Sequence, residues 1–256
     1  MLKDKVVVIT GGAGRIGSAF IDAVSRQNGI GVIADLDATQ AEILKNKILE
    51  KDPNRKLELF ELDITLPQSV QSILEYLHKK YGKIDALVNN AYPRNKNFGK
   101  KFFDVSSQDF SDFVSLHLGG YFNMSQKFIQ YFLTQGYGNI INISSIQGVV
   151  APAFETYVGT DMHSPIEYTV AKHGLIGMTK YMAKMFKKDK IRVNAISPGG
   201  ILDKQPEKFL TQYKNRCGVK GMLDAEDLTG ILVYLLSDSS EYMTGQNLIV
   251  DDGFVL

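Results

Sequence analysis

Val6-Val7-Val8-Ile9-Thr10-Gly11-Gly12-Ala13-Gly14-Arg15-Ile16-Gly17 is the stretch that decides the fold of this 256-residue chain. Its first part is apolar and β-branched, which predicts a buried strand, and a helical pattern follows through Phe20 and Val24. Glycines permit a tight turn and a close approach of the backbone, while the free N–H groups and positive dipole end of a helix start can hold a pyrophosphate. The stretch therefore predicts a nucleotide-binding turn, with an ordinary glycine turn as the alternative.

The rest of the chain repeats this alternation of short apolar runs and helix-period segments. We expect strands at Val6 to Thr10, Gly31 to Asp35, Leu57 to Leu62, Ala86 to Asn89, Asn139 to Ser144, Arg192 to Ile196 and Asn247 to Val250. Such a rhythm is typical of βαβ units. No linker or repeat divides the chain. We therefore expect one α/β domain over residues 1–256, a Rossmann-type doubly wound parallel sheet with helices on both faces.

Composition excludes several classes of protein. The 29 Lys and Arg residues balance 28 Asp and Glu residues, so nothing predicts a nucleic-acid partner, and no apolar run is long enough for a membrane span. Cys217 is the lone cysteine, and no signal-peptide pattern is present, so we expect a cytoplasmic protein. The histidines lie on different segments without ligand spacing, so no metal site is predicted.

The second expected strand ends at Asp35, about twenty residues after the glycine turn, where an acid can accept hydrogen bonds from an adenosine ribose. A carboxylate there also repels a 2′-phosphate, so NAD is preferred over NADP. Alternatively, Asp35 caps a helix that starts near Asp37. Arg15 beside the glycine turn can weaken the preference by pairing with phosphate.

Candidate catalytic residues follow the fifth expected strand. Ser164-Pro165-Ile166-Glu167 has the pattern of a helix start, with Ser164 as N-cap and Glu167 closing a capping box. Lys172 then lies one helical turn after Tyr168, where a cation favours the phenolate of a group whose ordinary pKa is about 10. Ser145, at the end of the strand, has a hydroxyl that can both donate and accept a hydrogen bond.

These residues give the chain a clear resemblance to the short-chain dehydrogenase/reductase family. Asp63 in Leu62-Asp63-Ile64 resembles the family's adenine-side aspartate, Asn89-Asn90-Ala91-Tyr92 resembles its Asn-Asn-Ala-Gly motif, and Ser197-Pro198-Gly199 matches the motif near the nicotinamide. The resemblance implies catalysis by Ser145, Tyr168 and Lys172. It also implies a cofactor site that consists of Gly11, Gly14, Arg15, Ile16, Gly17, Asp35, Asp63, Ile64, Asn90, Ala91, Tyr168, Lys172, Pro198, Gly199 and Ile201.

The chain departs from the family pattern at several positions. Arg15 occupies the place of the middle glycine, Tyr92 and Asp252 replace other glycines, and His117 stands where the family has a catalytic Asn. That Asn holds a water in a proton relay. Histidine can act in the same way or titrate near neutrality, and the alternative is a buried histidine with the relay lost.

Ser145 and Tyr168 lie farther apart than is usual in the family, which predicts a lid of extra residues at about 149–165. The irregular stretches Pro93 to Lys101, Gln147 to Pro165 and Gly199 to Val219 are the candidate walls of a substrate pocket. The hydroxyls and acids of the lid suit a hydroxyl- or amine-rich substrate.

With Asn-Asn-Ala-Tyr-Pro-Arg-Asn, this insertion resembles the dehydrogenases of flagellin-modification (nonulosonic-acid sugar) pathways and implies a sugar derivative as the small-molecule substrate. Polyol or gluconate dehydrogenation, 3-oxoacyl reduction and a non-catalytic nucleotide-binding regulator are the alternatives. The apolar residues Met178, Met182, Met185 and Phe186 predict that the helix of Tyr168 pairs with a second copy, in a homodimer or homotetramer.

Overall fold

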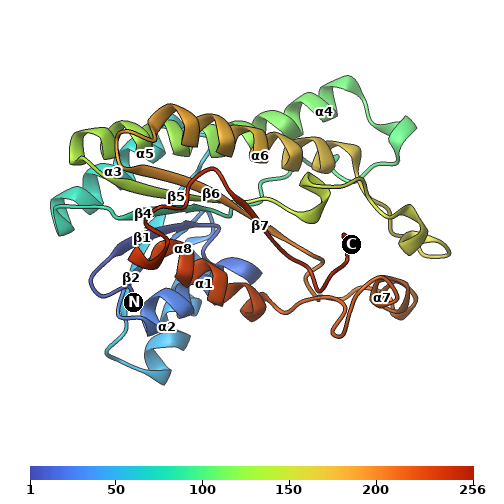
Figure 1. Ribbon diagram of the computed structural model, residues 1–256, viewed down its shortest axis with the longest axis horizontal. Helices are drawn as coiled ribbons and strands as arrows, with labels where there is room; N and C mark the ends of the chain where they lie inside the picture. Colours follow the sequence, from blue (N-terminus) through green and yellow to red (C-terminus); the bar gives the residue numbers. More distant parts are fainter.

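Seven parallel strands form one sheet in the order β3-β2-β1-β4-β5-β6-β7 (Figure 1). The computed structural model describes residues 1–256. The strands are β1 (Val6–Thr10), β2 (Ile30–Asp35), β3 (Lys56–Glu61), β4 (Ala86–Asn89), β5 (Gly138–Ile143), β6 (Ile191–Pro198) and β7 (Asn247–Val250). The doubly wound parallel sheet predicted from the sequence is confirmed, and most predicted strand ends are within one residue of those observed.

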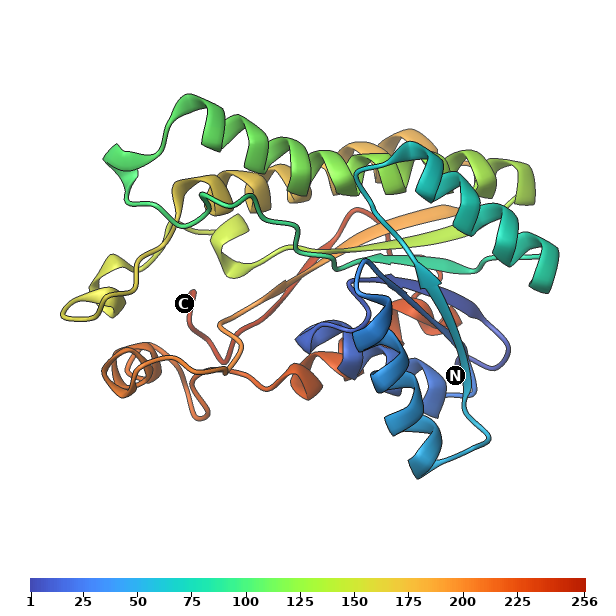
Figure 2. The same ribbon diagram turned by 180° about the vertical axis from the view of Figure 1, so that it is seen from behind.

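Helices cover both faces of this sheet (Figures 1 and 2). One layer holds α3 (Pro67–Tyr81), α4 (Ser107–Val114), α5 (Gly120–Gln135) and α6 (Ile166–Phe186), and the other holds α1 (Arg15–Arg26), α2 (Ala38–Lys51) and α8 (Thr229–Leu236). Val6 and Val8 of β1 join the core under the first layer, whereas Val7 and Ile9 join the core under the second. Because both faces are buried, the strand is apolar at each position from Val6 to Ile9.

The strand order places a crevice at the carboxyl ends of β1 and β4. The chain runs outward from β1 to β3, then returns and continues in the opposite direction from β4 to β7. In open α/β sheets the ligand lies at this switch point. The helix α7 (Glu207–Lys214), which the sequence patterns did not reveal, lies beyond the same ends of the sheet (Figure 1).

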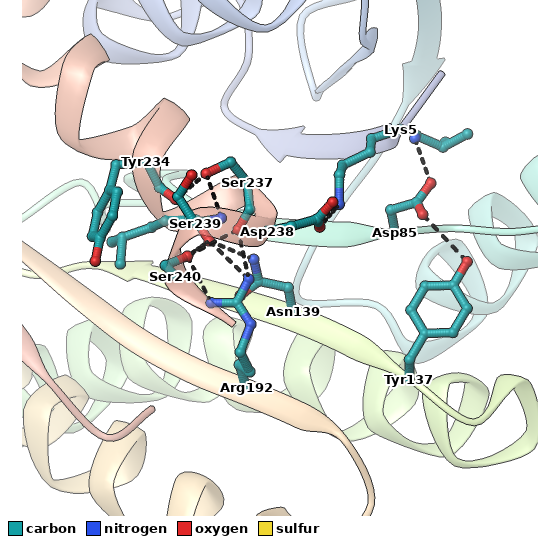
Figure 3. A network of polar contacts seen from close by, with 12 residues as sticks. Lys5, Asp85, Tyr137, Asn139, Arg192, Tyr234, Ser237, Asp238, Ser239 and Ser240 are labelled. Atoms are coloured by element: carbon teal, nitrogen blue, oxygen red, sulfur yellow. Dashed lines mark hydrogen bonds and ion pairs between the residues drawn. The ribbon is translucent and has the colours of Figure 1, made fainter. Parts of the chain in front are cut away.

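The amino ends of the strands are closed by a polar network (Figure 3). Arg192 donates to the Ser240 hydroxyl and to the Leu235 carbonyl, each over 3.0 Å, and Asn139 donates to the same carbonyl over 2.8 Å. Asp85 accepts from the Val6 N–H over 2.7 Å. This edge is held together by its own groups, so the carboxyl edge is the one available for chemistry.

The start of α6 differs from the sequence prediction. Pro165 is the N-cap residue, and no side chain caps the helix. The hydroxyl of Ser164 donates instead to the Gln147 side chain over 2.7 Å, and Glu167 accepts from the Gly99 N–H over 3.3 Å. The predicted capping box is therefore wrong, because both of its residues bind neighbouring loops.

Candidate active site

The glycine turn is so tightly packed that side chains would not fit at two of its positions. Gly11 has a φ of +62°, and a Cβ there would lie 2.8 Å from the Ala91 Cα. A Cβ at Gly17 would lie 2.1 Å from the Gly11 carbonyl oxygen. Helix α1 begins directly after Gly14, and no side chain caps it. The N–H groups of its first turn thus remain available, and the turn fits the pyrophosphate of a dinucleotide.

Asn90 and Ala91 tie the end of β4 to this turn. The Asn90 amide donates to the carbonyls of Thr10 and Gly11 over 3.0 and 3.1 Å. In return, the Thr10 hydroxyl accepts from the backbone N–H groups of Asn90 and Ala91 over 2.9 and 3.0 Å. These four hydrogen bonds hold the carboxyl ends of β1 and β4 in a fixed position relative to each other.

Asp35 stands at the end of β2 beside the glycine turn. Its carboxylate accepts from the Ala13 N–H over 2.9 Å and from the Asp37 N–H over 3.1 Å. The N-cap of α2 is Asp37, which accepts from Gln40. The alternative reading of Asp35 as that cap is therefore wrong. Because Asp35 is only half-buried, its remaining lone pairs can accept from a ligand.

The turn after β3 is shaped by Asp63, which accepts from both the N–H and the hydroxyl of Thr65 over 2.8 and 2.7 Å. Ile64 is buried in the core, so only its backbone can face a cofactor. Neither residue lines the main cavity described below. Both lie toward the β2 end of the crevice, where the adenine half of a dinucleotide would lie.

Arg15 joins the glycine turn to the segment that follows β6. Its guanidinium lies 2.5 Å from the Asp203 carboxylate and donates to the Leu202 carbonyl over 2.7 Å. Pro198, Gly199 and Ile201 belong to the same segment. The departure from glycine at position 15 thus has a structural partner, although both members of this ion pair are exposed.

One cavity of about 750 Å³ brings together three of the predicted catalytic residues and part of the predicted cofactor site. Such a volume is in the range of small-molecule sites. The predicted site residues that line it are Ser145, Tyr168, Lys172, Ile16, Asn90, Pro198, Gly199 and Ile201. All come from the carboxyl ends of strands, from the segments that follow them, or from the first two turns of α1 and α6.

Lys172 is the buried cation of this cavity. Its Nζ donates to the Ile143 carbonyl over 2.9 Å and lies over the rings of Tyr92, Tyr121 and Tyr168, 5.5 to 5.8 Å from their centroids. Burial lowers the pKa of Lys172 from 10.5 to about 7. The amine can therefore gain or lose a proton close to neutral pH.

Tyr168 is partly buried beside Ser145. Burial raises the pKa of its phenol above 10, and the neighbouring Ser145 hydroxyl opposes the shift. The sequence reasoning expected Lys172 to lower this pKa, but in this structure burial outweighs every other influence on the phenol. The Ser145 Oγ accepts from the Gln147 N–H over 3.1 Å, which leaves its hydroxyl hydrogen free to donate.

His117 lies outside the cavity lining, in a π-helical turn at Ser115–Gly119. Its ring is buried between Phe113 and Tyr121, with centroids 5.5 and 5.1 Å away, and neither ring nitrogen has a hydrogen-bond partner. Burial and the nearby Lys172 charge lower the pKa of His117 well below 6.5. The Pro93 backbone opposes this shift but does not outweigh it. A titration of His117 near neutrality does not fit this environment.

Two aromatic residues near Lys172 were not assigned a role from the sequence. Tyr92 contacts the Tyr168 ring edge-on at 5.6 Å, and Tyr121 is fully buried with an unpartnered hydroxyl. Tyr121 lies one helical turn after His117, which was the available signal for its position. Together with Tyr168, these rings surround the Lys172 amine.

The predicted insertion forms one wall of the cavity through Tyr157, Asp161, Met162 and His163. It packs on α7, beside which it lies in both views (Figures 1 and 2). The Tyr157 and Phe209 rings are 5.2 Å apart, and Gln212 donates to the Thr156 carbonyl over 2.8 Å. The wall is thus fixed to a separate small apolar cluster at the end of the sheet.

Comparison with known proteins agrees with this arrangement. The family model described as "Enoyl-(Acyl carrier protein) reductase" matches residues 12–255. The short-chain dehydrogenase from Leptospira borgpetersenii with bound NAD⁺ superimposes with a TM-score of 0.87 at 31% identity, over 100% of this chain and 94% of that chain. The chain belongs to the short-chain dehydrogenase/reductase family. It is therefore a dehydrogenase or reductase of the kind that uses a nicotinamide dinucleotide.

Individual relatives of this family member have different functional names. Post-translational flagellin modification protein A of Campylobacter coli is 44% identical over the full length of both chains. A 3-oxoacyl-acyl-carrier-protein reductase of Thermotoga maritima is 30% identical over 100% of this chain and 99% of its own. A probable galactose dehydrogenase of Rhizobium meliloti is 31% identical over 98% of this chain and 95% of its own. The resemblance to flagellin-modification dehydrogenases is confirmed, and a choice of substrate requires further argument.

No helix of this short-chain dehydrogenase/reductase combines the length and apolar character needed to cross a bilayer. Nowhere do three or more His, Cys, Asp or Glu side chains gather in a way that could hold a metal ion.

Proposed function

We propose that the chain is a cytoplasmic NAD(H)-dependent oxidoreductase that acts on a hydroxyl or carbonyl of a sugar or amino sugar, free or phosphorylated, in the synthesis of a surface or flagellin glycan. The observation that carries the proposal is that Ser145, Tyr168 and Lys172 line one cavity whose outer wall is the polar insertion. The bound dinucleotide supplies the hydride acceptor or donor.

In this proposal the protein's own residues orient the substrate and move its proton. The Ser145 hydroxyl donates to the substrate oxygen, since its oxygen accepts from the Gln147 N–H and its hydrogen is free. As the phenolate, Tyr168 takes the carbinol proton during oxidation, and as the phenol it returns a proton to the carbonyl oxygen during reduction. Lys172 stabilises the phenolate and binds the cofactor ribose. The backbone of the glycine turn, together with Asp63, Ile64, Asn90, Ala91, Pro198, Gly199 and Ile201, forms the rest of the cofactor site.

Two lines of support favour a sugar derivative. The insertion presents Tyr157, Asp161, His163 and Ser164 to the cavity, which offers hydrogen-bond partners to a substrate rich in hydroxyls. The similarity to a flagellin modification protein and to a probable galactose dehydrogenase supports the same class of substrate. For the cofactor, the Asp35 carboxylate supports NAD over NADP, with Arg15 partly neutralised by Asp203.

The description of the family model and the Thermotoga relative favour a second candidate, reduction of a 3-oxoacyl group on a carrier protein. The basic cluster at Lys184, Lys187, Lys188 and Lys190 is a poor docking site for that carrier. It lies at the far end of α6 from Tyr168, about 24 Å away at the helical rise of 1.5 Å per residue. The sugar reading is therefore preferred.

We also propose that the protein is a homodimer or homotetramer through the outer face of α5 and α6. An apolar groove there is lined by Val114, Leu118, Phe122 and Met178, and Phe122 is 49% exposed. Of the methionines named from the sequence, Met182 is buried and Met185 is exposed, so the apolar surface is arranged differently from the expectation. Light scattering at micromolar concentration tests this, and a monomeric mass would contradict it.

The test of the activity is Tyr168→Phe on whichever sugar derivative the unaltered protein oxidises with NAD. The change keeps the ring and removes the proton carrier, so turnover should fall by about 10²- to 10⁴-fold with NAD affinity unchanged. The matched control is Tyr181→Phe, on the same helix but 69% exposed and outside the cavity, which should keep full activity. Full turnover by Tyr168→Phe would contradict the assignment of Tyr168 as the proton carrier.

A further inference from the structure

Arg94 is a cation on the cavity wall that the protein itself does not use. It follows β4 in the loop Tyr92-Pro93-Arg94 and lines the same cavity as Ser145 and Tyr168. Its side chain makes no ion pair and no hydrogen bond with any group of the chain, whereas Arg15, Arg55, Arg192 and Arg216 all have polar partners. The guanidinium therefore has all of its donors free for a ligand.

The guanidinium is held in place by aromatic rings. Its Cζ lies 5.2 Å from the centroid of Tyr92 and 6.0 Å from that of Phe98, and these two rings contact each other edge-on. Stacking of this kind orients an arginine without using its N–H groups. Tyr92 also contacts the Tyr168 ring, so one aromatic ring separates the guanidinium from the proposed proton carrier. A small substrate can span both.

The loop that carries Arg94 is anchored to Asp109 of α4. Asn95 donates to the Asp109 carbonyl over 2.9 Å, and Asn97 donates to the Asp109 carboxylate over 2.7 Å. Lys100 pairs with the same carboxylate. Asp109 thus anchors the loop and neutralises Lys100, which leaves Arg94 as the unpaired charge directed into the cavity.

The other charges of the cavity give it a direction. Lys172 lies at the buried end, where its Nζ is already bound to the Ile143 carbonyl. Asp161, in the insertion, also lines the cavity and has no cationic partner. An anion would be repelled by Asp161 and attracted by Arg94. An anionic group of a ligand therefore belongs beside Arg94, at the mouth of the cavity.

We propose that Arg94 is the residue that selects an anionic substrate, binding a phosphate or carboxylate group of the sugar derivative while the reacting carbinol lies against Tyr168. This inference rests on the proposed function and adds the substrate's charge to it. A planar guanidinium with free N–H groups can bind phosphate or carboxylate through two parallel hydrogen bonds.

The first experiment measures binding without turnover. Inorganic phosphate is titrated calorimetrically into protein saturated with NADH, so that the pyrophosphate site beside Arg15 is already filled. Arg94→Gln should weaken phosphate binding about tenfold or more, and Arg94→Lys should restore part of it. The matched control is Lys96→Gln, which removes an exposed charge of the same loop that does not line the cavity and should change nothing. Equal phosphate affinity in the unaltered protein and Arg94→Gln, or no phosphate binding at all, overturns the proposal.

The second experiment compares a neutral hexose, its phosphate esters and its uronic acid as substrates with NAD. The unaltered protein should favour one anionic form, and the comparison of the ester with the acid shows which. Arg94→Gln should raise KM for that form by about 10- to 100-fold with kcat nearly unchanged. A preference for the neutral hexose, or an anionic preference that survives Arg94→Gln, overturns the proposal. Arg94-dependent phosphate binding without turnover of any sugar would instead support the anion site and contradict the proposed function.

Discussion

The Asp35 carboxylate accepts a hydrogen bond from the backbone N–H of Ala13 over 2.9 Å, so the acid at the end of β2 also holds the glycine turn of the cofactor site. Its negative charge and its role as an acceptor are separable. Asn in this position keeps an acceptor oxygen but loses the charge, whereas Ala loses both.

We expect Asp35→Asn to narrow the preference for NAD over NADP about tenfold, because removal of the charge lowers the repulsion of a 2′-phosphate. Asp35→Ala should also weaken NAD, since the Ala13 N–H loses its partner. Dissociation constants for NADH and NADPH from fluorescence titration test both statements. Equal affinities of the unaltered protein for the two cofactors would contradict the argument.

The buried Lys172 predicts an unusual dependence of stability on pH. In the unfolded chain this amine stays protonated to about its ordinary pKa of 10.5, whereas the folded chain releases the proton near pH 7. Between these values the unfolded state binds more protons, so the free energy of unfolding should rise with pH over that window. Below pH 7 both states are protonated and the contribution is flat.

Urea unfolding of the cofactor-free protein and of Lys172→Met across this range measures the effect. The difference in unfolding free energy, unaltered protein minus Lys172→Met, should increase steadily from neutral pH toward pH 10. A difference that stays constant would show that the Lys172 amine remains protonated in the fold, stabilised by the three tyrosine rings around it.

His117→Asn should leave the shape of the pH–rate profile unchanged near pH 6.5 and above, because burial lowers the pKa of the imidazole well below its usual value. Asparagine is smaller, so some loss of stability from the ring contacts with Phe113 and Tyr121 is expected. Disappearance of a transition near pH 6.5 in this variant would show that His117 titrates during turnover.

The sequence predicts the central strands well because they are buried on both faces, as in β1, whose residues Val6 to Ile9 are all apolar. It fails where a side chain finds its partner far along the chain. Ser164 and Glu167 form no capping box because they bind Gln147 and Gly99. His117 has a familiar position but an aromatic environment that no local pattern reveals.

Asp252 is a second position whose role the sequence does not reveal. It replaces a family glycine, and the structure gives it a φ of +55°, a conformation that aspartate tolerates better than most residues. Its carboxylate accepts from the N–H groups of Val219, Lys220 and Gly221. The Asp252 side chain thus stabilises the turn that follows α7. A comparison of motifs shows only that the family glycine is missing.

The insertion supplies the last prediction, because it is tied to α7 and not to the glycine turn. Replacement of residues 154–161 by a short Gly/Ser connector removes the Tyr157 contact with Phe209 and the Asp161 wall of the cavity. We expect kcat/KM for the sugar derivative to fall about 100-fold, since the substrate loses its positioning, while the dissociation constant of NAD changes less than about threefold.

Glu155→Gln is the control, because it breaks only the exposed ion pair with Arg216 and should leave both quantities unchanged. A parallel loss of NAD affinity in the connector variant would show that the insertion supports the nucleotide site, transmitted through Tyr213, whose hydroxyl accepts from the Gly200 N–H over 2.6 Å. That result would contradict its role as a substrate wall.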